Sequence, residues 1–266
     1  MSTYSYSYSY AVRDSATMLR RSLLHTVRYP VTIIVSLAVP AMLLLLFVGV
    51  FGGALGAGVG ATPSGGKYID YVLPGILLMS VGYGASSTTL AVNRDMTEGI
   101  IGRFRTMAIS RSSVLTGHVV AALIRTLVSA VLLVGVALLM GYRSSADAEK
   151  WLAAAGLVAL LTFALSWLAV AIGLAAPNAE GTSGFTLIVQ LLPFVSSAFV
   201  PTGSMNEGVR WFAHNQPFTP VIDALRGLLT GTPIGHSGLI AIAWCVGLTV
   251  LGYLWAGAQF RKAGAR

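Results

Sequence analysis

The chain has 266 residues, of which 55% are hydrophobic and only 10% are charged, and its mean hydropathy is +0.77. Because a soluble globular domain carries about 25% charged residues, this composition excludes a water-exposed globular body and favours an integral membrane protein. The net charge of +8 does not indicate nucleic-acid binding, since the basic residues cluster in short loops and tails beside apolar runs.

The N-terminal segment precedes the first apolar run. Residues 1–12 are rich in Tyr and Ser, and we expect them to be disordered because they have nothing to bury. Residues 13–30 follow a helical pattern with one apolar and one basic face. This pattern predicts an amphipathic helix lying along a membrane surface, and the alternative is a solvated lead-in to the first span.

Six apolar runs along the chain are predicted to be transmembrane helices. They cover Val31–Leu55, Tyr68–Val92, Val114–Tyr142, Trp151–Ala176, Phe185–Val200 and Gly238–Ala258. The fifth run is short and carries Pro193 near its centre, so we expect it to be kinked or extended at either end. The predicted fold class is all-α integral membrane, with residues 31–258 forming one six-helix transmembrane domain.

The distribution of Lys and Arg predicts the orientation of these spans. Eleven of the 17 basic residues fall in the N-terminal segment, the 93–113 loop and the C-terminal tail of residues 259–266. The loops on the opposite side hold five. By the positive-inside rule, both termini are therefore expected in the cytoplasm, with the protein in the cell membrane.

The 93–113 segment is charged in a chain that otherwise avoids charge. Read as a helix from Thr97, it places Phe104 on an apolar face, while Glu98 and Arg105 point away. Such a helix can rest on the cytoplasmic end of the bundle and present charge to a soluble partner. The alternative is a positive-inside loop that only sets orientation.

A second informative segment lies on the outside, at residues 201–235. Its central stretch, "VRWFAHNQPFTPVIDALRGLL" (209–229), is too short and too interrupted to span the bilayer. A hairpin dipping back into the outer leaflet would explain it, with Asn215, Pro217 and Pro220 forming the break. The alternative is an ordinary amphipathic loop helix.

No catalytic or metal-binding motif is apparent in the sequence. The Gly-rich stretch at 52–66 lacks the G-K-[ST] ending of a phosphate-binding loop, so we interpret it as an outside loop. If the protein consumes ATP, another polypeptide supplies the site. The only cysteine, Cys245, excludes a disulfide framework, and the four histidines lack ligand spacing.

Two charged residues near the spans have competing interpretations. Arg125 is the one basic residue inside a predicted span, which makes it a candidate for a functional site. The alternative interpretation is that the Arg125 side chain extends to the lipid headgroups of the inner leaflet. Glu180 is either a proton-coupling carboxylate or a residue of a tight inner turn beside Pro177.

Two motifs resemble the membrane subunit of type-2 ABC exporters, in the branch that includes the daunorubicin-resistance permeases. In "NRDMTEGIIGRFRTMAISRSSVLTGHVVAAL" the matching positions are Asp95, Glu98, Gly99, Arg103, Arg105, Ser110, Arg111 and Gly117. In "NQPFTPVIDALRGLL" they are Asn215, Pro217, Ala224, Leu225 and Arg226. The sequence departs from the family in two places, since Gln216 separates Asn215 from Pro217 and Ala108 replaces a usual proline.

The resemblance implies a permease that pairs with itself or with a sister permease and docks two cytoplasmic ATPase subunits. ATP and Mg²⁺ would be bound by the ATPase, and this chain would hold no cofactor and catalyse no reaction. The 93–113 segment would be a coupling helix, acting through Arg94, Asp95, Glu98, Gly99, Arg103, Phe104, Arg105 and Arg111. The outer hairpin would use Trp211, Asn215, Pro217 and Arg226.

The expected function is ATP-driven export of a hydrophobic or amphipathic substrate such as a drug, lipid or glycolipid. One alternative is a secondary transporter or channel, which would need ionisable groups at the middle of the membrane and two inverted halves. Another is an intramembrane lipid-modifying enzyme, which would need clustered histidines or carboxylates at one membrane face. The sequence shows neither feature beyond Arg125.

Overall fold

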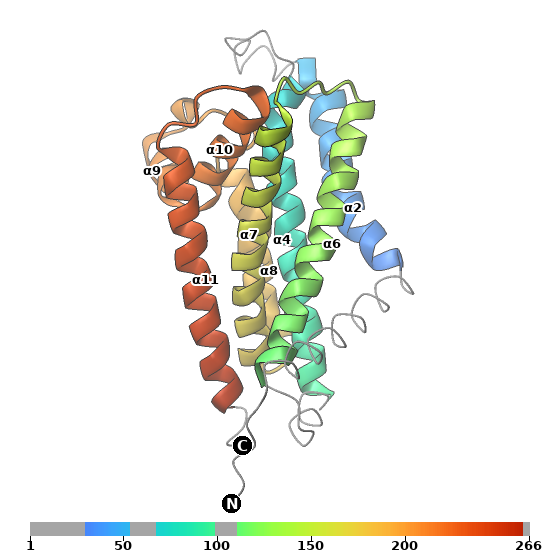
Figure 1. Ribbon diagram of the computed structural model, residues 1–266, viewed down its shortest axis with the longest axis vertical. Coiled ribbons are helices and arrows are strands. Elements are labelled where there is room, and N and C mark those ends of the chain that lie inside the picture. Colours follow the sequence, from blue (N-terminus) through green and yellow to red (C-terminus); the bar gives the residue numbers. More distant parts are fainter. Residues whose placement is uncertain (1–29, 54–67, 99–110, 263–266) are drawn as a thin grey trace, which may run out of the picture.

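The computed structural model describes residues 30–53, 68–98 and 111–262, and every regular element in these ranges is helical. Figure 1 shows the long helices running side by side along one axis. The elements in chain order are α2 (Pro30–Leu45), η1 (Leu46–Val50), α4 (Tyr68–Thr97), α6 (Arg111–Leu139), α7 (Ala148–Ala175), η2 (Glu180–Thr182), α8 (Ser183–Leu191), η3 (Leu192–Val195), η4 (Thr202–Ser204), α9 (Glu207–Asn215), α10 (Phe218–Thr230) and α11 (Ser237–Lys262). The predicted N-terminal tail, residues 13–29 of the amphipathic segment and most of the Gly-rich loop lie outside the described residues.

Four of these helices are long and apolar enough to cross a membrane. They are α4, Leu115–Leu139 of α6, α7 and α11, which match the second, third, fourth and sixth predicted spans. A span needs about 20 apolar residues because each residue of an α-helix advances only 1.5 Å across about 30 Å of hydrocarbon. The structure therefore confirms the all-α membrane class.

The first and fifth predicted spans are less regular than the other four. Helix α2 passes into a π-helical turn at Leu46–Val50, so the first run is helical from Pro30 to Val50 but is not α-helical throughout. Helix α8 ends at Leu191, and a 3₁₀ turn that contains Pro193 follows it. A proline lacks the N–H that would continue the α-helix, which explains the break. The six-span topology stays a prediction.

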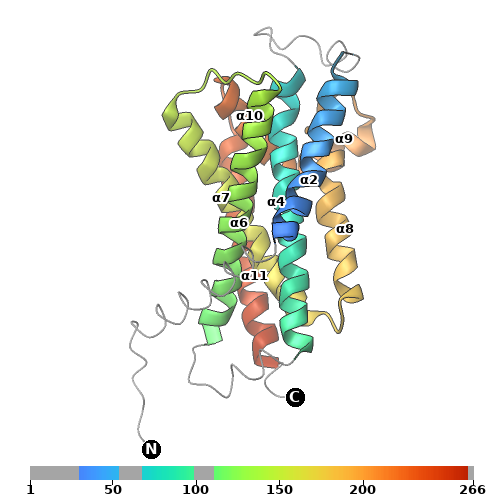
Figure 2. The ribbon, with the colours of Figure 1, turned by 90° about the vertical axis from the view of Figure 1, so that its right-hand side faces the viewer.

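Helices α4 and α7 form the centre of the bundle. Helices α6 and α11 both pack on α7, while α2 and α8 pack on α4, as the two views in Figures 1 and 2 show. The described part of α11 is largely exposed, with Leu239 and Leu254 among its uncovered side chains. An apolar exposed face is the arrangement expected for a helix that borders lipid.

Small residues allow the closest helix crossings, as the sequence pattern predicts. At Gly252 of α11, an added Cβ would lie 2.7 Å from the backbone nitrogen of Leu168 and 2.8 Å from the carbonyl carbon of Trp167. No side chain fits in that space. The glycine therefore sets the distance between α11 and α7.

The two ends of the bundle carry different elements. At one end, which we call the basic end, α4 and α11 terminate and α6 begins. Helix α4 continues five residues past the predicted span end at Val92, so Arg94 and Asp95 belong to its last turns. Helix α11 likewise includes Arg261 and Lys262, which the sequence assigned to a separate tail. At the opposite end, the hairpin end, lie α9 and α10.

Candidate functional site

At the basic end, a buried side chain of α4 caps the end of α7. Asn93 is only 1% exposed, and its Nδ2 donates hydrogen bonds to the carbonyl oxygens of Gly173 at 3.2 Å and Ala176 at 2.8 Å. The last carbonyls of a helix have no partner within it, and leaving them buried and unpaired is costly. Asn93 therefore provides hydrogen-bond donors for the last carbonyl groups of α7 and fixes the end of α4 against that helix.

A second contact joins α4 to α6 near the same end. Nε2 of His118 lies 3.2 Å from Oδ2 of Asp95, and the two side chains are 15% and 21% exposed, respectively. Whether the imidazole is neutral or protonated, an N–H at Nε2 can donate to the carboxylate. The pair holds together the two helices on either side of the 99–110 segment.

Only part of the predicted coupling segment belongs to the described residues. The side chains of Arg94 and Glu98 are exposed at the end of α4, and α6 starts at Arg111. Gly99, Arg103, Phe104 and Arg105 lie outside the described residues. The structure therefore describes the helices that flank this segment, and its coupling role stays a prediction.

Arg125 lies at the middle of α6, between that helix and α4. Its Nη2 donates a hydrogen bond to Oγ1 of the buried Thr88 at 3.1 Å, whereas its buried Nε has no partner in the part of the chain that the structure describes. Among the described residues, no carboxylate pairs with it. The guanidinium thus faces a neighbouring helix, and both a functional and a snorkelling role remain predictions.

The contacts between α4 and α6 follow a repeat that the sequence analysis missed. Thr88 and Asp95 are seven residues apart on α4, and their partners His118 and Arg125 are seven apart on α6. Seven residues are about two helical turns, or roughly 10 Å, so both pairs lie on one antiparallel seam. The sequence signal for this seam was the same seven-residue spacing of polar residues in two consecutive spans.

At the hairpin end, α9 and α10 form two short helices with different surroundings. Trp211 of α9 is 70% exposed, whereas α10 packs among α4, α7 and α11 and buries most of its apolar residues. The predicted break falls between Asn215, where α9 ends, and Phe218, where α10 begins. Pro220 was wrongly assigned to that break, since it lies in the first turn of α10, where a missing N–H is tolerated.

Arg226 of α10 is the centre of a polar network at the hairpin end. Its guanidinium carbon lies 3.9 Å from the ring centroid of Tyr71, and Nη1 donates to Oδ1 of Asp223 at 2.8 Å. Nη2 donates to the carbonyl oxygen of Ser197 at 2.6 Å, and both Nε and Nη2 approach that of Tyr71 at 3.3 Å. The hydroxyl of Ser197 in turn donates to Asp223 at 2.7 Å. One side chain therefore joins α10, α4 and the turn after η3.

Gln216, which interrupts the family pattern, has a structural role in the same region. Its side chain is 4% exposed, and Nε2 donates to the carbonyl oxygens of Val195 at 2.6 Å and Leu192 at 3.3 Å. These carbonyls belong to the 3₁₀ turn that follows α8. The extra residue thus ties the start of α10 to the end of the interrupted fifth run. Beside it, Nδ2 of Asn215 donates to the carbonyl oxygen of Trp211 within its own helix.

Among the described residues, no group of three or more His, Cys, Asp or Glu side chains forms a metal site.

A comparison with known families matches residues 14–230 to the family described as ABC-2 type transporter. This match covers most of the chain. The chain belongs to the ABC-2 type transporter family. It is therefore a multi-pass membrane permease.

Several curated proteins are similar to this family member. The daunorubicin resistance ABC transporter permease protein DrrB1 of Streptomyces coeruleorubidus is 28% identical over 241 residues, which cover 90% of this chain and 80% of that protein. A probable doxorubicin resistance ABC transporter permease protein DrrC of Mycobacterium tuberculosis is 23% identical over 192 residues, which cover 72% of this chain and 70% of that protein. A putative transport permease, ycf38, of Porphyra purpurea is 25% identical, with 89% and 81% covered.

Proposed function

We propose that this permease exports a hydrophobic or amphipathic molecule, such as a drug, lipid or glycolipid, with energy from a separate ATPase subunit. The names of two relatives, which refer to daunorubicin and doxorubicin resistance, support export of amphipathic compounds. Membership in the ABC-2 type transporter family argues against the alternative functions of a secondary transporter, a channel and a lipid-modifying enzyme. In this proposal the permease pairs with a second permease subunit, and the pair docks two ATPases.

The observation that carries the coupling role is the arrangement of the basic end. The 99–110 segment connects α4 to α6, and these helices are held together beside it by Asp95 and His118. Asn93 fixes the same turn of α4 to α7. A displacement applied to the segment would therefore act on three long helices together. We infer that the ATPase binds at this end, on the cytoplasmic side.

The two faces of the segment are expected to fail differently when they are changed. Glu98→Ala or Arg105→Glu removes charge presented to the ATPase, and loss of one partner of a charge pair that is buried in an interface costs about 2–5 kcal/mol. These variants should insert but bind the ATPase weakly and stop export. Phe104→Ala should keep ATPase binding while transport uncouples from hydrolysis. Co-purification of the ATPase and export are measured in the same cells.

If the Glu98 and Arg105 variants co-purify and export like wild type, the segment only sets orientation and the coupling proposal fails.

A separate experiment tests whether ATP is hydrolysed by the ATPase subunit and not by the permease. The isolated permease should hydrolyse no ATP, with activity appearing only when the ATPase is added. Hydrolysis by the isolated chain would contradict a division of labour between two subunits.

The proposed topology places the hairpin end outside the cell and both termini in the cytoplasm. Cysteine labelling tests it well because the single native cysteine, Cys245, is buried. Glu207→Cys and His214→Cys should react with an impermeant thiol reagent in intact cells. Lys262→Cys at the basic end is the matched control and should react only after permeabilisation. The reverse pattern would overturn the orientation.

A further inference from the structure

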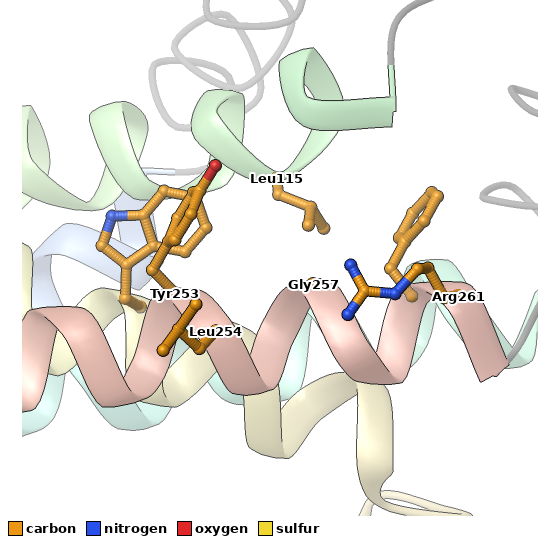
Figure 3. A pocket seen from close by; sticks show the side chains of 7 residues that line it. Leu115, Tyr253, Leu254, Gly257 and Arg261 are labelled. Atoms are coloured by element: carbon orange, nitrogen blue, oxygen red, sulfur yellow. The ribbon is translucent and has the colours of Figure 1, made fainter.

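A groove lies at the basic end between α6 and α11, with α7 as its floor. Its volume is about 320 Å³, and its lining residues come from all three helices (Figure 3): Leu115, Trp167, Tyr253, Leu254, Gly257, Phe260 and Arg261. Leu115 lies in the second turn of α6, and Arg261 lies in the last turn of α11. The groove therefore extends from the end of the bundle into its apolar body.

The floor and one wall of the groove form a rigid aromatic surface. The rings of Trp167 and Tyr253 meet edge to face, with centroids 4.9 Å apart and planes at 82°. Trp167 is only 4% exposed, whereas Tyr253 and Leu254 are 55% and 63% exposed. Aromatic and aliphatic side chains in this arrangement suit a flexible hydrocarbon chain laid against them.

The mouth of the groove carries a positive charge. Figure 3 shows the Arg261 side chain folded along α11, and its Nη1 lies 3.7 Å from the position of a Cβ added at Gly257. Within the described part of the chain, Arg261 forms no hydrogen bond or ion pair, and no acidic side chain lines the groove. Lys262 adds a second positive charge at the same helix end.

We propose that this groove binds an anionic phospholipid, with the phosphate at Arg261 and an acyl chain along Trp167 and Leu254. A guanidinium presents parallel N–H donors that match two phosphate oxygens, and basic pockets at helix ends attract anionic headgroups. The apolar depth favours a lipid over free inorganic phosphate, because phosphate would leave the exposed side chains of Tyr253 and Leu254 without a partner. This lipid site does not depend on which molecule the permease exports.

The test uses Trp167 as the reporter inside the groove. The other four tryptophans are replaced with Phe (Trp151, Trp211, Trp244 and Trp255), and the full chain is reconstituted in vesicles. Brominated phosphatidylglycerol and brominated phosphatidylcholine are compared as quenchers at equal mole fractions. We expect phosphatidylglycerol to show about fivefold higher relative affinity, from the usual contribution of one basic residue near anionic lipid.

Three variants assign the preference to the groove. Arg261→Gln should make the two lipids equal, whereas Lys262→Gln, a matched control one position along, should keep most of the preference. Gly257→Leu should fill the groove and weaken quenching by both lipids. Circular dichroism and gel filtration verify that each variant is folded. Equal quenching by both lipids in the reporter protein would overturn the proposal, as would an absence of quenching because a second copy covers the groove.

Discussion

The basic end and the hairpin end hold their helices together in different ways. At the basic end, two polar contacts join helix ends, namely the amide of Asn93 to α7 and the side chain of Asp95 to that of His118. At the hairpin end, the single side chain of Arg226 makes polar contacts with three residues, Asp223, Tyr71 and Ser197, and α10 is packed on most sides.

From this difference we expect the hairpin end to contribute more to stability and the basic end to be better suited to transmitting motion. The network around Arg226 is shared by three elements, so removing one member leaves several polar groups unpaired. The Asp95–His118 pair is partly exposed, and such pairs contribute little to stability. We therefore expect changes at the hairpin end to alter folding, and changes at the basic end to alter transport.

The largest effect on stability is expected from Arg226→Ala. It leaves the carbonyl oxygens of Tyr71 and Ser197 without their donor and Asp223 without its cation, at a cost of about 2–3 kcal/mol. Arg226→Lys should lose less, because the charge remains but the planar fork of donors is gone. Thermal unfolding in detergent, followed by tryptophan fluorescence, measures both variants. An Arg226→Ala protein as stable as wild type would remove the distinction between the two ends.

A somewhat smaller loss is expected from Gly75→Ala, also at the hairpin end. An added Cβ would lie 2.9 Å from the Cα of Ala198, so α4 and the turn after η3 must separate, which costs about 1–3 kcal/mol. Gly247→Ala on α11 is the matched control, since nothing lies within 4 Å of its added Cβ. The control should unfold at or slightly above the wild-type temperature. Equal effects of the two changes would mean that the crossing at Gly75 adapts freely.

The smallest effect on stability is expected at the basic end, from Asp95→Asn or His118→Gln. Each should change the free energy of unfolding by less than about 1 kcal/mol, as is usual for partly exposed pairs. Export should nevertheless fall by about fivefold or more, the lower end of typical coupling effects between sites. The double variant Asp95→His with His118→Asp should restore part of it. Normal export by both single variants would show that this pair does not transmit motion.

The sequence predicted the positions of the long helices well because membrane insertion depends on a local property. Continuous apolar runs indicated α4, α6, α7 and α11 within a few residues. The helical pattern in 209–229 likewise indicated α10, whose apolar residues Val221, Ile222 and Leu225 are fully buried. Helix ends were less accurate, since Arg94 and Arg261 continue their helices past the apolar runs. Charged residues are compatible with a helix once it leaves the hydrocarbon.

Composition and order along the chain thus determined that this protein is a multi-pass helical membrane protein, because about 20 consecutive apolar residues can satisfy their backbone in lipid only as a helix. Only the tertiary structure decided which polar side chains meet. Arg226 and Tyr71 are 155 residues apart, and Asn93 reaches a carbonyl 80 residues away. Such contacts depend on how each helix is rotated and how far it is displaced along its neighbour. Those two quantities are set by packing at positions such as Gly75 and Gly252, where one added carbon would move a whole helix.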